Sequence, residues 1–253
     1  MTLLDELKIF VKNILHWIYA LIVCSIFFFS FGLEETTVFG QKYLLPLPTS
    51  ESFSVQIFNT IRYDLLPPSV QLLVTNPMSA FVSQILFSVS LAFLSTVPFL
   101  VYRIIVYIRP ALLPQEKKAV LWSLLPMISL FFAGCAFSYF FLIPATFKVL
   151  YPYAESINAI PFFSVDEFIY YVFGLMVTVG LIFLLPLFMV LLSLMGIIEA
   201  SFWIKKWRPA LLFFLVLSAI ITPDGTGITM IMLFLPLASL YFMGCVFAKK
   251  LGK

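Results

Sequence analysis

The chain has 253 residues, of which 62% are hydrophobic and only 11% are charged, and its formal net charge is +3. A soluble domain carries roughly a quarter charged residues, so this chain has too few charges to cover a water-facing surface. The composition therefore predicts a protein whose main solvent is lipid. It disfavours a transmembrane barrel, whose strands alternate polar and apolar residues. No basic cluster with interleaved aromatic residues indicates nucleic-acid binding.

Six apolar runs follow one another along the chain. A helix of about 20 apolar residues crosses the hydrocarbon of a bilayer, and we expect spans at residues 14–33, 80–108, 119–143, 169–195, 209–222 and 228–247. The second run is long enough to tilt or to kink at Pro98, and the fifth is short for a full crossing. A re-entrant pair made of the last two runs is the alternative. The fold class is thus an all-α integral membrane protein with one transmembrane domain, residues 1–253.

The first run follows a polar, amphipathic segment at residues 1–12 and is too long for the apolar core of a signal peptide. We interpret it as a retained span. With six spans and the N-terminus inside, 12 of the 15 basic residues fall in inner segments and only Lys42, Arg62 and Lys148 fall outside. This bias predicts that both termini are cytoplasmic. The inner residues are Lys8, Lys12, Arg103, Arg109, Lys117, Lys118, Lys205, Lys206, Arg208, Lys249, Lys250 and Lys253.

The first outer loop, residues 34–79, contains apolar residues at helical spacing between two pairs of prolines. These residues are Phe53, Ile57, Phe58, Ile61 and Leu65. They predict an amphipathic helix that lies on the outer surface or caps the bundle. The second outer loop, residues 145–168, carries aromatic residues that suit the headgroup level, namely Tyr151, Tyr153 and Phe162.

Motifs for catalysis are absent from the sequence. There is no nucleophile elbow, no zinc-protease helix and no phosphate loop, and His16 is the only histidine. The three cysteines have no metal-site spacing and are expected to be small apolar fillers. No Asp, Glu, Lys or Arg lies at mid-depth in a span, which disfavours a proton or ion path. We therefore expect no enzyme, no metal and no cofactor, and we keep a multi-pass small-solute transporter or channel as the alternative function.

Glu116 lies in the inner loop between the second and third spans, and Glu6 lies just before the first. A carboxylate on a basic inner surface is suited to bind a guanidinium in bidentate fashion. Pairing with Lys117 or Lys118, or capping of the third helix, would explain Glu116 equally simply.

Six motifs in chain order resemble the TatC family, the multi-spanning subunit of the twin-arginine protein translocase. They are Leu4-Asp5-Glu6-Leu7-Lys8; Tyr107, Pro110, Leu112 and Glu116 of the first inner loop; Gly134, Phe137, Tyr139, Pro144 and Phe147; Phe183, Pro186 and Met195-Gly196-Ile197; Lys205-Lys206-Trp207-Arg208-Pro209; and Thr222-Pro223-Asp224 with Pro236. The resemblance runs nearly end to end and agrees with the topology inferred from charge.

The resemblance implies a receptor that binds twin-arginine signal peptides of folded cargo in the cell membrane. It implies a concave six-helix bundle that assembles with small single-span Tat subunits and is oligomeric in the complex. The residues that match the family's peptide-binding face are Glu6, Lys8, Tyr107, Pro110, Leu112 and Glu116. The resemblance thus favours the receptor role of Glu116 over simple pairing or capping.

Three positions depart from the family pattern. Lys8 replaces an arginine, Leu184 replaces a glutamate in the fourth span, and the last turn reads Thr-Pro-Asp-Gly-Thr-Gly. Without that glutamate, Gln84 or Thr178 could supply the polar contact to the partner subunit. The alternative, which we favour, is that the chain contacts its partner by apolar packing. The residues that we expect at the partner contact are Gly174, Gly180, Leu184 and Pro186.

Overall fold

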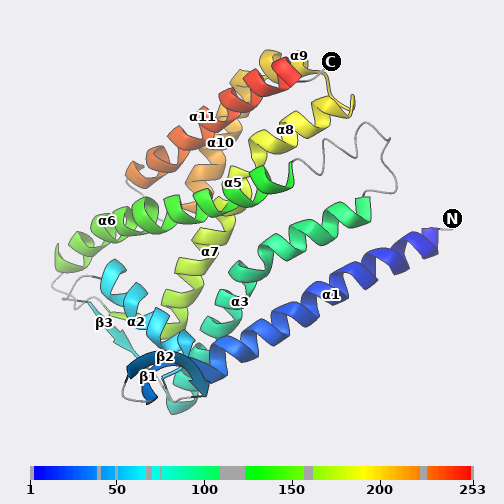
Figure 1. Ribbon diagram of the computed structural model, residues 1–253. Helices are drawn as coiled ribbons and strands as arrows, with labels where there is room; N and C mark the ends of the chain where they lie inside the picture. The colour runs from blue at the N-terminus through cyan, green and yellow to red at the C-terminus, as the bar shows by residue number, and fades with distance from the viewer. Residues whose placement is uncertain are drawn as a thin grey trace. The chain divides into compact units, whose positions relative to one another are not determined.

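The structure is a computed structural model that describes residues 3–38, 41–48, 51–66, 70–74, 76–108, 123–156, 162–222 and 227–251. Its elements divide between two units (Figure 1). The first unit comprises Met1–Tyr107 and Pro161–Phe173, and the second comprises Ile108–Ile160 and Gly174–Lys253. Helix α7 contributes its first half to one unit and its second half to the other.

Five helices have the length and hydropathy of membrane spans: Lys8–Ser30, Met78–Ile104, Leu124–Pro152, Val165–Leu194 and Ile228–Lys250. A sixth apolar helix, α10 (Trp207–Ile221), is shorter. At 1.5 Å per residue its 15 residues extend about 22 Å, less than the roughly 30 Å of a hydrocarbon core. The prediction of an all-α membrane protein with six apolar helices, the fifth of them short, is confirmed.

In the first unit, α1 (Leu3–Ser30) and α3 (Pro77–Ile108) run side by side in opposite directions. Three aromatic pairs join them, with ring centroids 5.0 Å apart for Phe10 and Tyr107, 5.8 Å for Trp17 and Phe93, and 6.0 Å for Phe29 and Phe81. The Trp17 indole also donates a hydrogen bond to the Thr96 hydroxyl at 3.2 Å. No residue in the most apolar stretch of α1 is buried by the rest of the chain, so lipid is the expected solvent around most of this helix.

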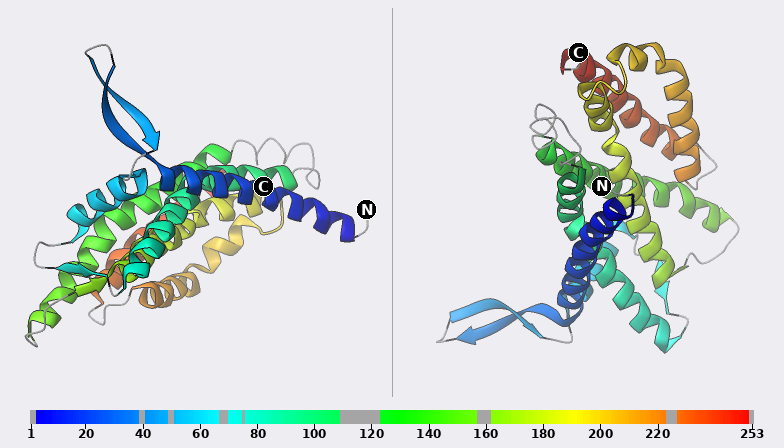
Figure 2. Two further views of the ribbon diagram at one scale, coloured as in Figure 1. Left: turned by 90° about the horizontal axis from the view of Figure 1, so that it is seen from below. Right: turned by 90° about the vertical axis from the view of Figure 1, so that its right-hand side faces the viewer.

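A β-hairpin follows α1 directly and was not expected from the sequence. Strands β1 (Phe31–Val38) and β2 (Gln41–Pro48) are antiparallel, with Phe31 opposite Pro48, and Figure 2 shows the hairpin extending away from the end of α1. The predicted end of the first span at residue 33 is therefore wrong, because the helix ends at Ser30. The two prolines of β2 are tolerated because each strand of a two-stranded ribbon has a free edge.

Helix α2 (Phe53–Leu65) confirms the amphipathic helix predicted in the first outer loop. Its Ile61 and Leu65 are buried, and the Phe58 ring contacts Phe87 of α3 and Phe168 of α7 at centroid distances of 5.3 and 6.1 Å. Two short parallel strands, β3 (Gln71–Leu73) and β4 (Phe162–Ser164), precede α3 and α7. Apolar packing against two helices thus fixes α2 in place.

In the second unit, the third span is one continuous helix made of α5 (Leu124–Phe137), a π-helical turn η2 (Ser138–Leu142) and α6 (Ile143–Ser156). In the π turn the Ile143 N–H bonds to the Ser138 carbonyl, five residues back. The next residue, Pro144, has no N–H to donate, and in a regular α-helix its ring would clash with the carbonyl four residues back. The widened π turn accommodates this ring. The prediction that this span ends at residue 143 is wrong, since helix continues to Ser156.

The fourth span is interrupted at Leu184, between α7 (Val165–Phe183) and α8 (Leu185–Leu194). Pro186 occupies the first turn of α8, where its missing N–H would have no helical partner. The two helices run in different directions (Figure 1). The fourth span therefore changes direction where Pro186 begins α8.

The rest of the second unit consists of a short helix α9 (Ala200–Lys205), α10 and α11 (Ile228–Leu251). Two hydrogen bonds hold α9. The Trp203 indole donates to the Ser193 hydroxyl of α8 at 3.0 Å, and the Tyr241 hydroxyl of α11 donates to the Trp203 carbonyl at 2.7 Å. Of the predicted last turn, residues 223–227, residues 223–226 lie outside the described residues, and Gly227 has a positive φ of 74°.

Candidate functional site

The predicted receptor site lies where α1 begins and α3 ends. Glu6 and Lys8 belong to the first two turns of α1, Lys8 is exposed, and Tyr107 is the penultimate residue of α3. The side chain of Glu6 and the whole of Pro110, Leu112 and Glu116 lie outside the described residues.

The start of α1 contacts the end of α3 through Phe10 and Tyr107, whose rings are 5.0 Å apart. Glu6 lies one helical turn before Phe10 on α1. Tyr107 leads within nine residues to Glu116. The start of α1 and the end of α3, which are distant in sequence, thus lie together at one end of the first unit.

Two residues at this end were missed by the sequence analysis as site residues. Phe10 and Arg103 line a small hollow between α1 and α3 of about 10 Å³. The Arg103 guanidinium lies 5.8 Å from the centre of the Phe99 ring, and within the described part of the chain its buried Nε has no hydrogen-bond partner. A charge inside the predicted second span, five residues before its end, was the available signal for Arg103.

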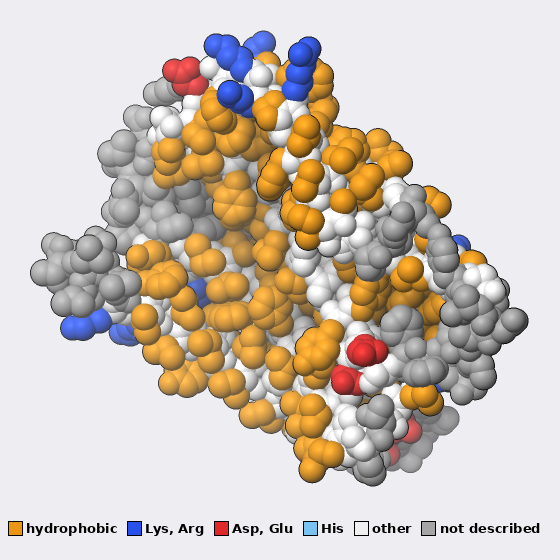
Figure 3. Space-filling model, turned by 180° about the vertical axis from the view of Figure 1, so that it is seen from behind, with side chains coloured by type: hydrophobic (Ala, Val, Ile, Leu, Met, Phe, Trp, Pro, Cys, Tyr) orange, Lys and Arg blue, Asp and Glu red, His pale blue; other side chains and the backbone are white. Residues whose placement is uncertain are grey.

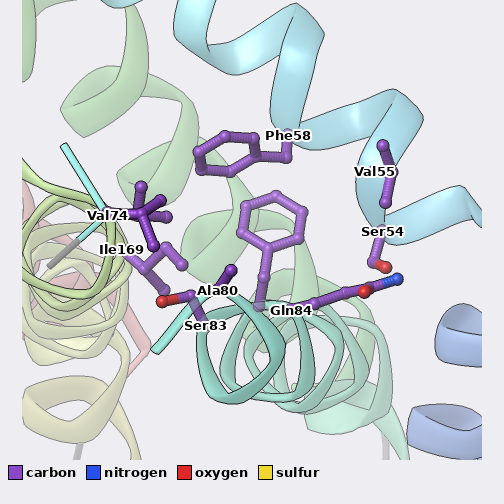
Figure 4. Close-up of a pocket in the computed structure, with 10 residues that line it drawn as sticks. Ser54, Val55, Phe58, Val74, Ala80, Ser83, Gln84 and Ile169 are labelled. Atoms are coloured by element: carbon purple, nitrogen blue, oxygen red, sulfur yellow. The ribbon is translucent and has the colours of Figure 1, made fainter. Parts of the chain in front are cut away.

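A larger pocket of about 240 Å³ lies near the other end of α3, between α2, α3 and the start of α7. Figure 4 shows Phe58, Val74 and Ile169 around it, with Ser83 and Gln84 on α3. Its lining is mainly apolar, in keeping with its position among membrane helices. The pocket supplies no group for catalysis.

Gln84, one of the two polar candidates from the sequence, is already used inside the chain. Its amide donates to the Ser52 hydroxyl at 3.2 Å, and that hydroxyl lies 2.8 Å from the Ser54 hydroxyl. The contact holds the start of α2 against α3. The other candidate, Thr178, is half-buried on α7.

The four residues predicted for partner contact have different surroundings. Gly180 faces Gly134: a Cβ on Gly180 would lie 2.8 Å from the Phe131 ring and 2.9 Å from the Cys135 sulfur. Leu184 and Pro186 are buried within the second unit. Gly180 therefore serves the close approach of α5 and α7 within this chain, and Gly174 alone of the four is exposed, with open space before it.

Comparison with known proteins extends the agreement over the whole chain. Residues 4–236 match the family described as Sec-independent protein translocase protein TatC. The chain is 32% identical over 248 residues to the Sec-independent protein translocase protein TatC of Cenarchaeum symbiosum, covering 98% of this chain and 93% of that protein.

Two solved structures, both crystal structures of the twin-arginine translocase receptor TatC, share this fold. The first has a TM-score of 0.73 at 25% identity, and the match covers 97% of this chain and 99% of that chain. The second, in the detergent DDM, has a TM-score of 0.74 at 26% identity, and the match covers 98% of this chain and 99% of that chain. Because the match spans every described element, the protein is a translocase subunit of the membrane rather than an enzyme. The chain belongs to the TatC family of Sec-independent protein translocase proteins.

Proposed function

We propose that this chain is the receptor that binds twin-arginine signal peptides, with Glu6 and Glu116 as the carboxylates that accept the two arginines. The observation that supports this most directly is the contact of Phe10 with Tyr107, since it joins the helix of Glu6 to the segment that leads to Glu116. Lys8, Pro110 and Leu112 complete the proposed peptide-binding face. Both ends of the chain are cytoplasmic in this proposal, as the distribution of basic residues predicts.

The chemistry of the proposed site is a charge-assisted hydrogen bond. A guanidinium presents two parallel N–H donors that match the two oxygens of a carboxylate. A hydrogen bond to a charged group contributes about 1.5–3 kcal/mol, which corresponds to roughly ten- to a hundredfold in affinity. Lys8 offers no planar fork, so we assign it a role in shaping the local field rather than in bidentate recognition.

Binding of a synthetic twin-arginine signal peptide to the purified protein tests this proposal. Glu116→Ala should weaken binding by roughly tenfold or more, and Glu116→Lys should weaken it further because it adds repulsion. Raising the salt concentration should also weaken binding, since ionic screening reduces attraction between exposed charges. A matched peptide with two lysines in place of the arginines serves as the control. Unchanged peptide affinity in a folded Glu116→Lys variant would show that another group recognises the arginines.

We further propose that a single-span Tat subunit packs against α7 at Gly174. The open space beside this glycine permits close approach of another helix, which favours association where lipid surrounds both. Gly174→Leu should reduce crosslinking of the partner to α7 several-fold without changing the stability of the purified chain. Leu181→Ala, at another exposed position of the same helix, is the control. Equal crosslinking in the two variants would place the contact elsewhere.

A further inference from the structure

The second unit carries an apolar groove next to a group of cations that have no role in the proposed signal-peptide site. The groove has a volume of about 250 Å³ and is lined by Ile204 of α9, Trp207 of α10, and Phe242 and Cys245 of α11. Three of these side chains are also well exposed, between 41% and 45%. The apolar side chains of the groove are therefore open to the surrounding medium at this end of the second unit.

The groove walls are held in place by the surrounding helices. The rings of Trp207 and Phe242 lie 6.3 Å apart across it. The Tyr241 hydroxyl fixes α9 to α11 through the Trp203 carbonyl, and the Trp203 indole fixes it to α8. Because three elements are tied together here, the groove is a preformed feature of the unit.

Five exposed cations lie close in sequence to the groove residues, at the junction of α9 and α10 and at the end of α11: Lys205, Lys206, Arg208, Lys249 and Lys250. Figure 3 shows Lys and Arg side chains gathered at the end formed by α9 and the C-terminal end of α11, directly beside hydrophobic side chains. Among the residues that the structure describes, none of the five has an ion-pair partner. Their positive charge is thus available to an external anion.

The spacing on α11 aligns a cation with the groove. Lys249 lies four residues after Cys245 and seven after Phe242, which places the three on one face of the helix. Cys245 lies five residues, or about 7–8 Å, before Lys250 at the end of the apolar span. If the apolar span ends at the headgroups, this spacing would set the groove at the depth of the upper part of a lipid chain and the cations at the depth of its headgroup.

The start of α10 adds to the positive potential. Trp207 is its first residue, its first turn contains no acidic residue, and its N-cap, Lys206, makes no side-chain capping bond. The N-terminal end of a helix carries partial positive charge and favours a negative group. The Arg208 guanidinium lies 5.4 Å from the centre of the Trp207 ring, so the groove wall and the charged rim are continuous.

We propose that this groove is a binding site for an anionic phospholipid, with an acyl chain along the apolar wall and the phosphate at the cations. Charge complementarity selects this occupant: a zwitterionic lipid would fill the groove but would gain little from five cations, and a free phosphate would gain nothing from the apolar wall. The site goes beyond the proposed receptor function. Its assignment to the inner leaflet follows from the proposed orientation, whereas its chemistry does not depend on that orientation.

Thermal unfolding of the purified protein in detergent, titrated separately with phosphatidylglycerol and phosphatidylcholine, tests the site. A ligand that binds only the folded state raises its unfolding midpoint, and the stabilisation grows with the logarithm of the ratio of ligand concentration to Kd. The unmodified protein should bind phosphatidylglycerol at least fivefold more tightly than phosphatidylcholine. Glycerol phosphate, which has the headgroup but no chains, should leave the midpoint unchanged.

Lys206→Gln/Lys249→Gln should weaken phosphatidylglycerol binding by roughly tenfold, since each basic residue near an anionic surface contributes to the attraction. The matched control is Lys12→Gln/Lys148→Gln, which removes the same charge from exposed positions that do not line the groove and should change affinity less than twofold. Ile204→Trp, which fills the groove and keeps every cation, should weaken binding as well. Both test variants should unfold at the same midpoint as the parent without lipid, because all three positions are exposed.

Four results would overturn the proposal. Equal losses in the two double variants would mean diffuse surface charge rather than a site. Stabilisation by glycerol phosphate equal to that by the lipid would mean an anion site without use of the groove. Equal affinity for the two lipids would mean that the cations do not select the headgroup. An unfolding midpoint that rises with protein concentration but not with lipid would make a second copy of this chain the occupant.

Discussion

Gly180 and Gly174 lie six residues apart on α7, but the first is closely packed and the second faces open space. Substitutions at the two positions therefore serve as test and control. A methyl group on Gly180 would lie under 3 Å from both Phe131 and Cys135, whereas one on Gly174 would meet nothing within 4 Å. Gly180→Ala should therefore destabilise the protein by about 1–3 kcal/mol through overpacking. Gly174→Ala should be neutral or slightly stabilising, because alanine favours helix. Thermal unfolding in detergent measures both, and equal midpoints would contradict the close approach of α5 and α7.

Gln84 is a polar side chain of α3 that holds the start of α2 by a hydrogen bond. Its bond to Ser52 is half-buried, and a hydrogen bond of this kind contributes about 0.5–1.5 kcal/mol. Gln84→Leu should lower stability by that amount without affecting partner crosslinking. A double-mutant cycle with Ser52→Ala isolates the pair. Strictly additive effects of the two substitutions would show that the bond contributes nothing.

At the scale of elements, Tyr241 decides whether α9 stays attached to α11. Its hydroxyl donates to the Trp203 carbonyl at 2.7 Å and its ring is buried. Tyr241→Phe should cost about 1 kcal/mol and should raise hydrogen exchange in α9 while leaving α10 unchanged. Tyr170→Phe, at a position that is 64% exposed, is the control. If exchange in α9 is the same in both variants, the Tyr241 hydroxyl does not hold α9 and the Trp203 bond to Ser193 and apolar packing suffice.

The hairpin and the π turn are the elements that sequence patterns missed. The apolar residues of 31–33 extended the first predicted span because hydropathy does not distinguish a strand from the end of a helix. The π turn follows from the position of Pro144 inside a helix that neighbouring helices keep intact.

At the scale of the molecule, the distribution of basic residues predicts which ends of the spans face the cytoplasm. Glu51→Cys and Lys205→Cys place exposed thiols in segments predicted to be on opposite sides. In a background without Cys24, Cys135 and Cys245, an impermeant thiol reagent applied to intact cells should label Glu51→Cys. It should reach Lys205→Cys only after permeabilisation. Labelling of both from outside would rule out the proposed orientation.

The sequence by itself determined the membrane environment, the six apolar runs, the amphipathic α2 and the short fifth run. These features rest on composition and periodicity, which are local properties. It also indicated the TatC family, because the motifs occur in order along the whole chain.

The tertiary structure was needed to show which side chains already contact other parts of the chain. Gly180 and Gln84 look available in the sequence, yet both are engaged by residues distant in the chain, Phe131 and Ser52. Phe10 and Tyr107 are separated by nearly a hundred residues and meet because α1 and α3 pack in opposite directions. The groove beside Lys249 likewise exists only because α9, α10 and α11 converge. Long-range packing creates these sites, and no local pattern specifies which helices become neighbours.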